Sequence, residues 1–290
     1  QGLYELGSTF KIFTAATSLE KGLANPQTII DTTPFKWNRK TYKDYKNYGP
    51  TNSVEDIIMK SSNVGTIRMA LAAGTTAQKK TLNDLGFFEA VPVELGEASR
   101  TKPQIPKNWS DTSTITISFG HGISATPLHL ATAYSIVANG GFRVKPTIKK
   151  VNSNNLAKEK VISQKTSQQL ISMLRRVVSE VDGTAKMAKV DGYQVAGKTG
   201  TAEKIKPTGG YYDKKVIATF ASFFPASNPK YTLVVSLDEP EIEVLGESRR
   251  TAGFTAVPVA AEIITRVAPI LNLRPIATDD AMAYTSISSQ

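Results

Sequence analysis

The first half of the chain carries apolar residues with helical spacing. Between residues 8 and 21 these positions recur with the period of an α-helix, and Gly22 follows as a stop signal. The face that we expect to be buried consists of Ile12, Ala15, Ala16 and Leu19. Similar spacing predicts helices over about residues 53–59, 65–73 and 127–138. A β-branched run at residues 114–119 favours a strand.

The pattern changes in the second half. A helix at about 164–180 precedes stretches with strand character at 193–205, 216–225 and 231–237, and short turns between them favour antiparallel pairing. A last helix is expected at about 256–270, with an apolar face that can cover the sheet. Helices followed by an antiparallel sheet and a covering helix predict an α+β fold. We expect one domain over residues 1–272 and a tail without periodicity over 273–290.

Composition adds few constraints. The chain has 290 residues, 40% hydrophobic and 21% charged, which is typical of a globular protein. It has no cysteine, so disulfides and a cysteine nucleophile are excluded. Its two histidines, His121 and His129, have no ligand spacing, and we expect neither a metal nor another cofactor. No apolar run reaches the length of a membrane span, and no signal peptide opens the chain.

The net charge of +10 raises the possibility of nucleic-acid binding. The basic residues are scattered, however, and no DNA-binding motif accompanies them, so we expect no nucleic-acid partner. One cluster of aromatic and basic residues occurs at 35–48, FKWNRKTYKDYKNY. The interpretation that we favour is a solvated loop. The alternative is a surface that faces an anionic membrane or polymer.

A serine followed three residues later by a lysine is the first candidate for chemistry. The pattern occurs four times, at Ser8, Ser18, Ser99 and Ser227. Only Ser8 follows a glycine at the start of a predicted helix, where a serine and a lysine three residues apart share one face. A lysine with a lowered pKa could then take the serine proton. The alternative is a capping Ser8 and a solvated Lys11.

Two further motifs follow in the order of a serine acyl-transfer site. Ser61-Ser62-Asn63 ends a predicted helix, where a hydroxyl could relay a proton and an amide could hold a substrate carbonyl; it is also ordinary turn chemistry. Lys198-Thr199-Gly200-Thr201 lies in a predicted strand whose glycines indicate close approach by another backbone. An edge strand of this kind can pair with a peptide substrate. Lys198 and the two threonine hydroxyls could then bind a terminal carboxylate. The alternative is that Lys198 is a surface lysine on a hairpin.

The three motifs together resemble the penicilloyl serine transferases, and most closely the class B penicillin-binding proteins of the septal, cell-division type. The similarity extends to about residue 270, through GSTFKIFTAAT, IMKSSNVGTIRMA, SFGHGISATPLHLATAYSIVANGG, VAGKTGTAEK and RRTAGFTAVPVAA.

The resemblance implies a peptidoglycan D,D-transpeptidase with a role for each motif residue. Ser8 would be the acylated nucleophile and Lys11 its general base. Ser61 would relay a proton to the leaving amine, and Asn63 would contact the substrate amide. Lys198, Thr199, Gly200 and Thr201 would form the carboxylate-binding strand, and the amides of Ser8 and Thr201 would form the oxyanion hole. The implied ligands are stem peptides ending in D-Ala-D-Ala and β-lactams, which resemble them.

The resemblance also implies a setting. The fold would be that of penicillin-binding proteins and β-lactamases, an antiparallel sheet covered by helices beside a helical subdomain. We expect the strands that complete this sheet, and a membrane anchor, to lie upstream of the stretch given. The location would be the periplasmic face of the bacterial inner membrane. A polytopic membrane glycosyltransferase and other divisome proteins would be partners.

Three alternatives remain. A β-lactamase or a β-lactam sensor shares the first and third motifs, but no clear deacylating base accompanies Ser61 to Asn63. A degenerate scaffold is disfavoured by the intact motifs. The segment Gly120-His121-Gly122-Ile123-Ser124-Ala125 fits a dinucleotide-binding fingerprint and would indicate an oxidoreductase. It lacks the acidic residue expected some 20 positions on.

Overall fold

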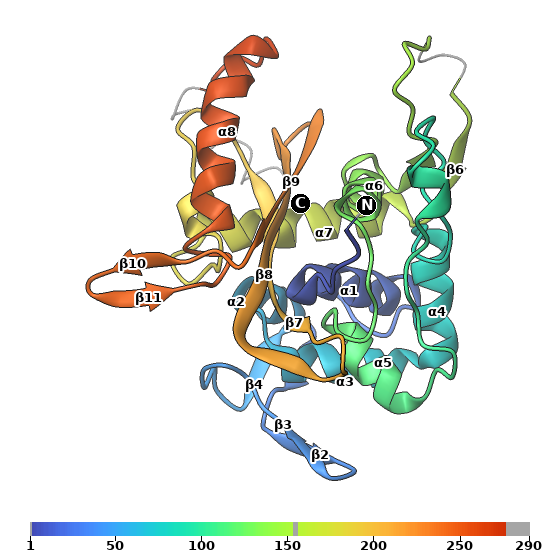
Figure 1. Ribbon diagram of the computed structural model, residues 1–290, viewed down its shortest axis with the longest axis vertical. Helices are drawn as coiled ribbons and strands as arrows, with labels where there is room; N and C mark the ends of the chain where they lie inside the picture. The colour runs from blue at the N-terminus through green and yellow to red at the C-terminus, as the bar shows by residue number, and fades with distance from the viewer. Residues whose placement is uncertain (1, 153–155, 277–290) are drawn as a thin grey trace.

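The computed structural model describes residues 2–152 and 156–276. Its central sheet has three antiparallel strands in the order β7-β8-β9 (Figure 1), with β7 at Ala196–Ile205, β8 at Tyr211–Phe224 and β9 at Tyr231–Asp238. The three predicted strands and their antiparallel pairing are therefore confirmed. In the part of the chain described, β7 pairs only with β8, so β7 is an edge strand.

Helices pack on both sides of this sheet. Figure 1 shows α8 (Ala256–Ile270) on one side, and α1 (Lys11–Glu20) and α6 (Pro127–Ala138) on the other. The apolar face of α8 is buried at Val257, Ala260 and Ile264, as its spacing predicts. Helix α7 (Gln164–Ser179) packs against β7. These contacts confirm the α+β class.

The helical part surrounds α1. It consists of α2 (Val54–Lys60), α3 (Asn63–Ala73), α4 (Thr75–Asp84) and α5 (Asp111–Ser118), together with the 3-10 turns η1 (Gly7–Phe10) and η2 (Ala98–Arg100). A further 3-10 turn, η4 (Lys186–Ala188), packs against α7 and α8. Aromatic rings fix α1 in this core, because Phe13 contacts Phe10, Phe87 and Tyr134. The Tyr134 hydroxyl also donates to the carbonyl of Thr9, one residue after Ser8. The start of α1 is thereby held in a rigid setting.

The strand expected at 114–119 is wrong. Residues 111–118 form α5, which begins with a capping box between Ser110 and Ser113. Its β-branched residues Thr114, Ile115 and Ile117 are buried, and α5 packs on α3. Helix capping and burial outweigh strand propensity at this site. Helix α4, which has few apolar residues, was not predicted.

In the described residues, four pairs of short antiparallel strands lie outside the central sheet. They are β1 (Ile29–Asp31) with β4 (Thr51–Ser53), β2 (Phe35–Trp37) with β3 (Lys40–Tyr42), β5 (Phe142–Val144) with β6 (Lys158–Lys160), and β10 (Ile242–Val244) with β11 (Glu247–Arg249). The β2–β3 hairpin occupies the stretch predicted as a loop. Among the residues described, no helix combines the length and apolarity needed to span a bilayer. Most of the predicted tail, residues 277–290, lies outside the description.

Candidate active site

Ser8 lies in the 3-10 turn η1 that leads into α1. Gly7 has a φ of 54°, a conformation that favours glycine, so the chain turns sharply before Ser8 as predicted. The turn begins without a side-chain cap, and the Ser8 hydroxyl makes no hydrogen bond within the described residues. The capping alternative for Ser8 is therefore wrong. The half-buried hydroxyl remains available to a substrate.

Lys11 is fully buried, with 0% of its surface exposed, so the alternative of a solvated side chain is also wrong. Its Nζ donates to the Ser61 carbonyl at 2.5 Å and to the Ser61 Oγ at 3.0 Å. Burial lowers the pKa of Lys11 from 10.5 to about 7, and the negative charge of Asp44 opposes this shift. Near neutral pH this amine is therefore deprotonated for much of the time, as a general base must be.

Lys198 approaches the same hydroxyl from β7. It is 0% exposed, and its Nζ lies 2.9 Å from the Ser61 Oγ and 3.3 Å from the carbonyl of Thr199. Burial, and secondarily the charge of Lys11, lower the pKa of Lys198 well below its ordinary value. The alternative of a surface lysine is wrong. The Ser61 hydroxyl thus joins two buried amines from distant parts of the sequence.

The turn that carries Ser61 connects α2 to α3. Ser61 ends α2 in the left-handed conformation, with a φ of 64°, and Ser62 caps α3 by accepting from the amide of Gly65. Asn63 is the half-buried first residue of α3. The turn therefore ends one helix and caps the next, and the same geometry directs the Ser61 side chain toward the two lysines. The interpretation as a turn between helices is confirmed, whereas the proton relay by Ser61 and the substrate contact of Asn63 stay predictions.

One residue of this site was missed by sequence reasoning. Asp44 follows β3, and its carboxylate accepts from the Ser62 hydroxyl and from two backbone amides at the start of α3. It is the single acidic residue in the basic stretch at 35–48. That isolation was the available signal, since a lone carboxylate among cations is a candidate for a specific contact.

The Lys198-Thr199-Gly200-Thr201 strand lies against the η1 turn. A Cβ on Gly200 would come within 2.2 Å of the Leu6 carbonyl, and Gly7 packs on the backbone of Thr201. The predicted close approach of another backbone is therefore present. The Thr199 hydroxyl bonds to that of Thr184, and the Thr201 hydroxyl accepts from the Ala252 amide. These bonds fix both threonine side chains along the edge of β7.

The other Ser-x-x-Lys matches do not form comparable sites. The lysines that belong to them, Lys21, Lys102 and Lys230, are all exposed. Ser18 is buried and lies near the carbonyl of Met69, whereas Ser227 is exposed. Among the described residues, only the Ser8 match pairs the serine with a buried amine.

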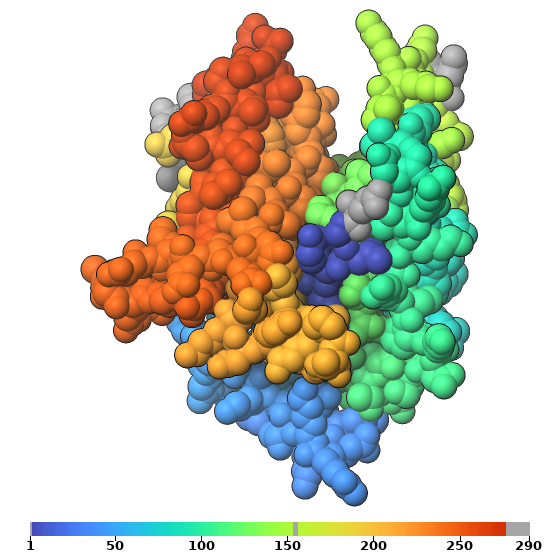
Figure 2. Space-filling model, viewed as in Figure 1, coloured from blue at the N-terminus to red at the C-terminus, as the bar shows by residue number. Residues whose placement is uncertain are grey.

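The segment Gly120 to Ala125 also contributes to the site. It follows α5 rather than a strand, which removes the context that a dinucleotide fingerprint requires. The Gly120 carbonyl accepts from the Gly7 amide, and a Cβ on Gly120 would lie 1.9 Å from the Gly7 carbonyl. The glycine therefore serves close packing beside Ser8. In Figure 2 the dark-blue N-terminal segment is visible where the orange strands and the green residues meet.

A buried polar cluster borders the same segment. Glu5 is 5% exposed and accepts from the Gly122 amide and the Tyr211 hydroxyl. Burial raises the pKa of Glu5. The His121 ring makes an edge-to-face contact with that of Tyr211, and burial lowers the pKa of His121 to about 4, so its ring is neutral at neutral pH. The cluster fixes the segment that supports Gly7.

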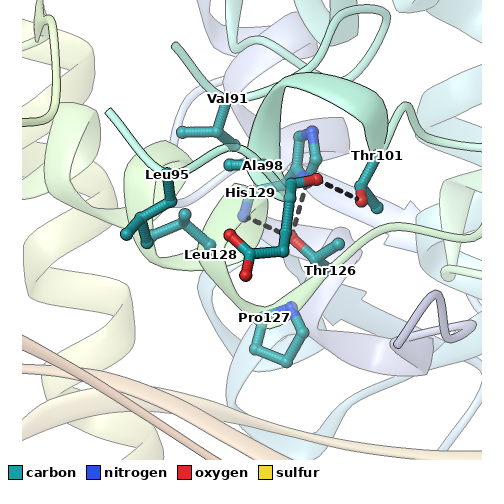
Figure 3. Close-up of a pocket in the computed structure, with 9 residues that line it drawn as sticks. Val91, Leu95, Ala98, Thr101, Thr126, Pro127, Leu128 and His129 are labelled. Carbon is teal, nitrogen blue, oxygen red and sulfur yellow. Dashed lines mark hydrogen bonds between the residues drawn. The ribbon is translucent and has the colours of Figure 1, made fainter. Parts of the chain in front are cut away.

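A separate apolar pocket lies at the start of α6, away from these groups. Figure 3 shows its lining, which includes Val91, Leu95, Pro127 and Leu128, and the bonds between His129 and Thr126. None of the predicted site residues lines it. In the described part of the chain, no group of histidine or acidic side chains has the arrangement of a metal site.

A half-buried serine one turn before a buried lysine, which shares a second hydroxyl with another buried lysine, is the arrangement of a serine acyl transferase. The comparisons with known proteins define the family. The chain belongs to the penicillin-binding protein transpeptidase domain family, whose model matches residues 1–265.

Individual relatives agree with this assignment. The chain is 33% identical over 280 residues to a probable peptidoglycan D,D-transpeptidase FtsI of Caulobacter vibrioides, covering 94% of this chain and 47% of that protein. It thus spans about half the length of this relative. The transpeptidase domain of penicillin-binding protein 3 from Burkholderia pseudomallei matches with a TM-score of 0.86 and 31% identity, over 95% of this chain and 82% of that one.

A further structure carries a ligand. Penicillin-binding protein 3 of Mycobacterium tuberculosis, solved with ampicillin, matches with a TM-score of 0.84 and 29% identity, over 96% of this chain and 64% of that one. The fold expected from the sequence motifs is confirmed by these structures.

Proposed function

We propose that this chain is the catalytic domain of a peptidoglycan D,D-transpeptidase that acts in septal cell-wall synthesis and is acylated by β-lactams. The observation that carries the proposal is the Ser61 hydroxyl held between the buried amines of Lys198 and of Lys11, which follows Ser8 by one turn. Family membership and the FtsI and penicillin-binding protein 3 relatives support it.

Acylation follows from this geometry. Neutral Lys11 takes the Ser8 proton, and the Ser8 oxygen attacks the carbonyl of the penultimate D-Ala. The amides of Ser8 and Thr201 stabilise the oxyanion. Ser61 passes a proton, supplied by the adjacent lysines, to the departing D-Ala amine. The acyl group remains on Ser8 as an ester.

Substrate binding falls to the edge of β7 and to Asn63. An extended stem peptide can pair with β7, because its outer edge has no strand partner in the described residues. Lys198 and Thr199 hold the terminal carboxylate, beside Gly200, and Asn63 contacts the peptide amide. An amine from a second stem peptide then attacks the ester and completes the cross-link. A β-lactam enters the same path and leaves a stable ester on Ser8.

The cellular setting is part of this proposal. The stem peptides of peptidoglycan lie at the periplasmic face of the inner membrane, so we place the domain there. We propose a polytopic membrane glycosyltransferase and other divisome proteins as partners, since cross-linking acts on newly polymerised glycan. The similarity to a probable peptidoglycan D,D-transpeptidase FtsI supports peptidoglycan as the substrate on which this placement depends.

A covalent-labelling experiment tests the proposal. The chain is incubated with fluorescent penicillin, denatured and separated on a gel. We expect a persistent adduct that is lost in Ser8→Ala. Ser227→Ala removes the exposed serine of another Ser-x-x-Lys match and is expected to label normally. An adduct retained in Ser8→Ala would place the nucleophile elsewhere, and rapid loss of the wild-type label would identify a β-lactamase.

A further inference from the structure

Asp44 makes an unusually complete set of contacts with the turn that carries Ser61. Its Oδ2 accepts from the Ser62 hydroxyl at 2.6 Å, and its Oδ1 accepts from the amides of Asn63 and Val64 at 2.6 and 3.0 Å. The first amides of a helix have no partner within the helix. A side chain from outside α3 therefore satisfies its two leading amides.

The same contacts determine where the Ser61 hydroxyl points. Ser62 donates to Asp44 and also accepts from the Gly65 amide, so its side chain has a single orientation. Ser61 immediately precedes it in a left-handed conformation that is unfavourable for a residue with a side chain. Surrounding contacts must maintain such a conformation. The hydrogen bonds of Asp44 to Ser62 and Asn63 hold the part of the turn that follows Ser61 in place.

The charge of Asp44 acts on the buried amine of Lys11 as well. Three groups face Lys11 from packed elements: Lys198 from β7, His121 from the segment after α5, and Asp44 from the segment after β3. His121 is neutral at neutral pH. Asp44 is thus the anion of this set, and it favours the protonated form of Lys11.

We propose that Asp44 is a positioning residue, which holds the Ser61–Asn63 turn in register with Lys11 and Lys198 and supplies the negative charge that faces Lys11. Its action is indirect, since it contacts the turn and not the reacting atoms. The inference rests on the proposed acylation of Ser8 and deepens it. It also gives the predicted basic loop at 35–48 a defined connection to the site.

Two substitutions separate the two parts of this role. Asp44→Asn keeps an oxygen for the Asn63 and Val64 amides and an amide group that can meet the Ser62 hydroxyl, but it removes the charge. Asp44→Ala removes the charge and the acceptors. In both variants the rate constant for acylation by penicillin is measured as a function of pH, together with the melting temperature.

The expected results differ between the variants. Asp44→Asn retains the plateau rate within about threefold, whereas the midpoint of the pH profile falls by about half a unit, because Lys11 loses a stabilising anion. The plateau rate of Asp44→Ala is expected to fall by at least about tenfold, because the Asn63 and Val64 amides lose their acceptor and the turn is no longer held in position. If Asp44 had only a structural role, its substitution would change the melting temperature and leave the midpoint of the pH profile unchanged.

Asp31 offers a matched control. Its exposed carboxylate accepts from Thr33 and pairs with Arg68 of α3, with no contact to the Ser61–Asn63 turn. Asp31→Asn is expected to match the wild type in midpoint and plateau. An unchanged midpoint in Asp44→Asn, or a wild-type plateau in folded Asp44→Ala, would overturn the inference. If the wild type itself forms no adduct, the proposed function fails instead.

Discussion

At the scale of single residues, the two lysines define how the site handles protons. Lys11 and Lys198 donate toward one oxygen, and burial lowers the pKa of both. Two ammonium groups on one hydroxyl repel each other in a water-poor setting. The site therefore favours a state in which only one amine carries a proton, which suits a base and a proton donor that work in sequence.

The pH dependence of acylation tests the role of Lys11. Its pKa of about 7 means that the neutral amine, the form able to accept the Ser8 proton, increases as the pH rises through 7. We expect the second-order rate constant with penicillin to rise about tenfold per pH unit below this midpoint and to level off above it. Stopped-flow measurement of labelling gives the profile. A rate independent of pH over this range would exclude Lys11 as the base.

Lys198 provides a test of how far a buried active-site amine lowers the stability of the fold. Replacing a buried polar amine with an apolar side chain of similar length removes a desolvation penalty. We expect Lys198→Met to raise the melting temperature by about 2–4 °C while acylation falls at least about a hundredfold. Lys204→Met, on the same strand, loses pairs with Asp238 and Glu239 and should neither stabilise the fold nor reduce labelling. A lower melting temperature for Lys198→Met would contradict this account.

The sequence predicted the identity of the motif residues but not their environment. A glycine before Ser8 and a unique Lys-Thr-Gly strand were sufficient to select them. The burial of Lys11 and Lys198, which separates them from surface lysines, depends on packing between elements and has no local signature. Asp44 is isolated among basic residues in the sequence, but its partners lie about 20 residues further on, so only the folded chain identifies its contacts.

At the scale of elements, the η1 turn and β7 pack closely against each other. Gly200 lies so near the Leu6 carbonyl that a methyl group would meet it at 2.2 Å. We expect Gly200→Ala to lower the free energy of unfolding by about 1–3 kcal/mol and to slow acylation, because the strand must move away from Ser8. Chemical denaturation and penicillin labelling give the two quantities.

Gly96→Ala is the control for this substitution. Gly96 lies in open space at a conformation that other residues adopt. Its replacement should change the free energy of unfolding by no more than about 0.5 kcal/mol. Equal effects of the two alanines would show that the η1–β7 contact does not limit the site.

Element prediction succeeded where periodicity and burial agree. The apolar face of α8 and the strands β7 to β9 follow their patterns closely. It failed at α5, where β-branched residues are buried in a capped helix, and at α4, whose polar sequence gives no apolar stripe. In both cases packing against α3 and α1 stabilises a helix that the local sequence does not predict.

At the scale of the whole molecule, the segment after α8 returns to the body of the domain. The Ile276 amide donates to the Gly192 carbonyl, Pro275 covers Gly192, and the Tyr193 hydroxyl donates to Leu273. We expect a chain that ends at Ile276 to melt as the full chain does, because none of these contacts is removed. A chain that ends at Asn272 should lose about 1–2 kcal/mol of unfolding free energy.

Calorimetry of the two truncated chains checks this expectation, with penicillin labelling as a test that the site is intact. Equal stability of the two would support a boundary at 272, as the sequence periodicity predicts. A loss in the shorter chain would move the boundary to 276.

The backbone contacts of the η1 turn with Gly120 and with β7 have a consequence for folding kinetics. These segments lie far apart in the sequence, yet Gly7 contacts both Gly120 and the backbone of Thr201 on β7. Contacts of such long sequence separation close the largest loops of the chain and form slowly. Nucleophile, base and strand therefore come together only when the helical part and the sheet have both docked. Covalent capture by a β-lactam during refolding would then time the last step of folding, which probes of secondary structure do not detect.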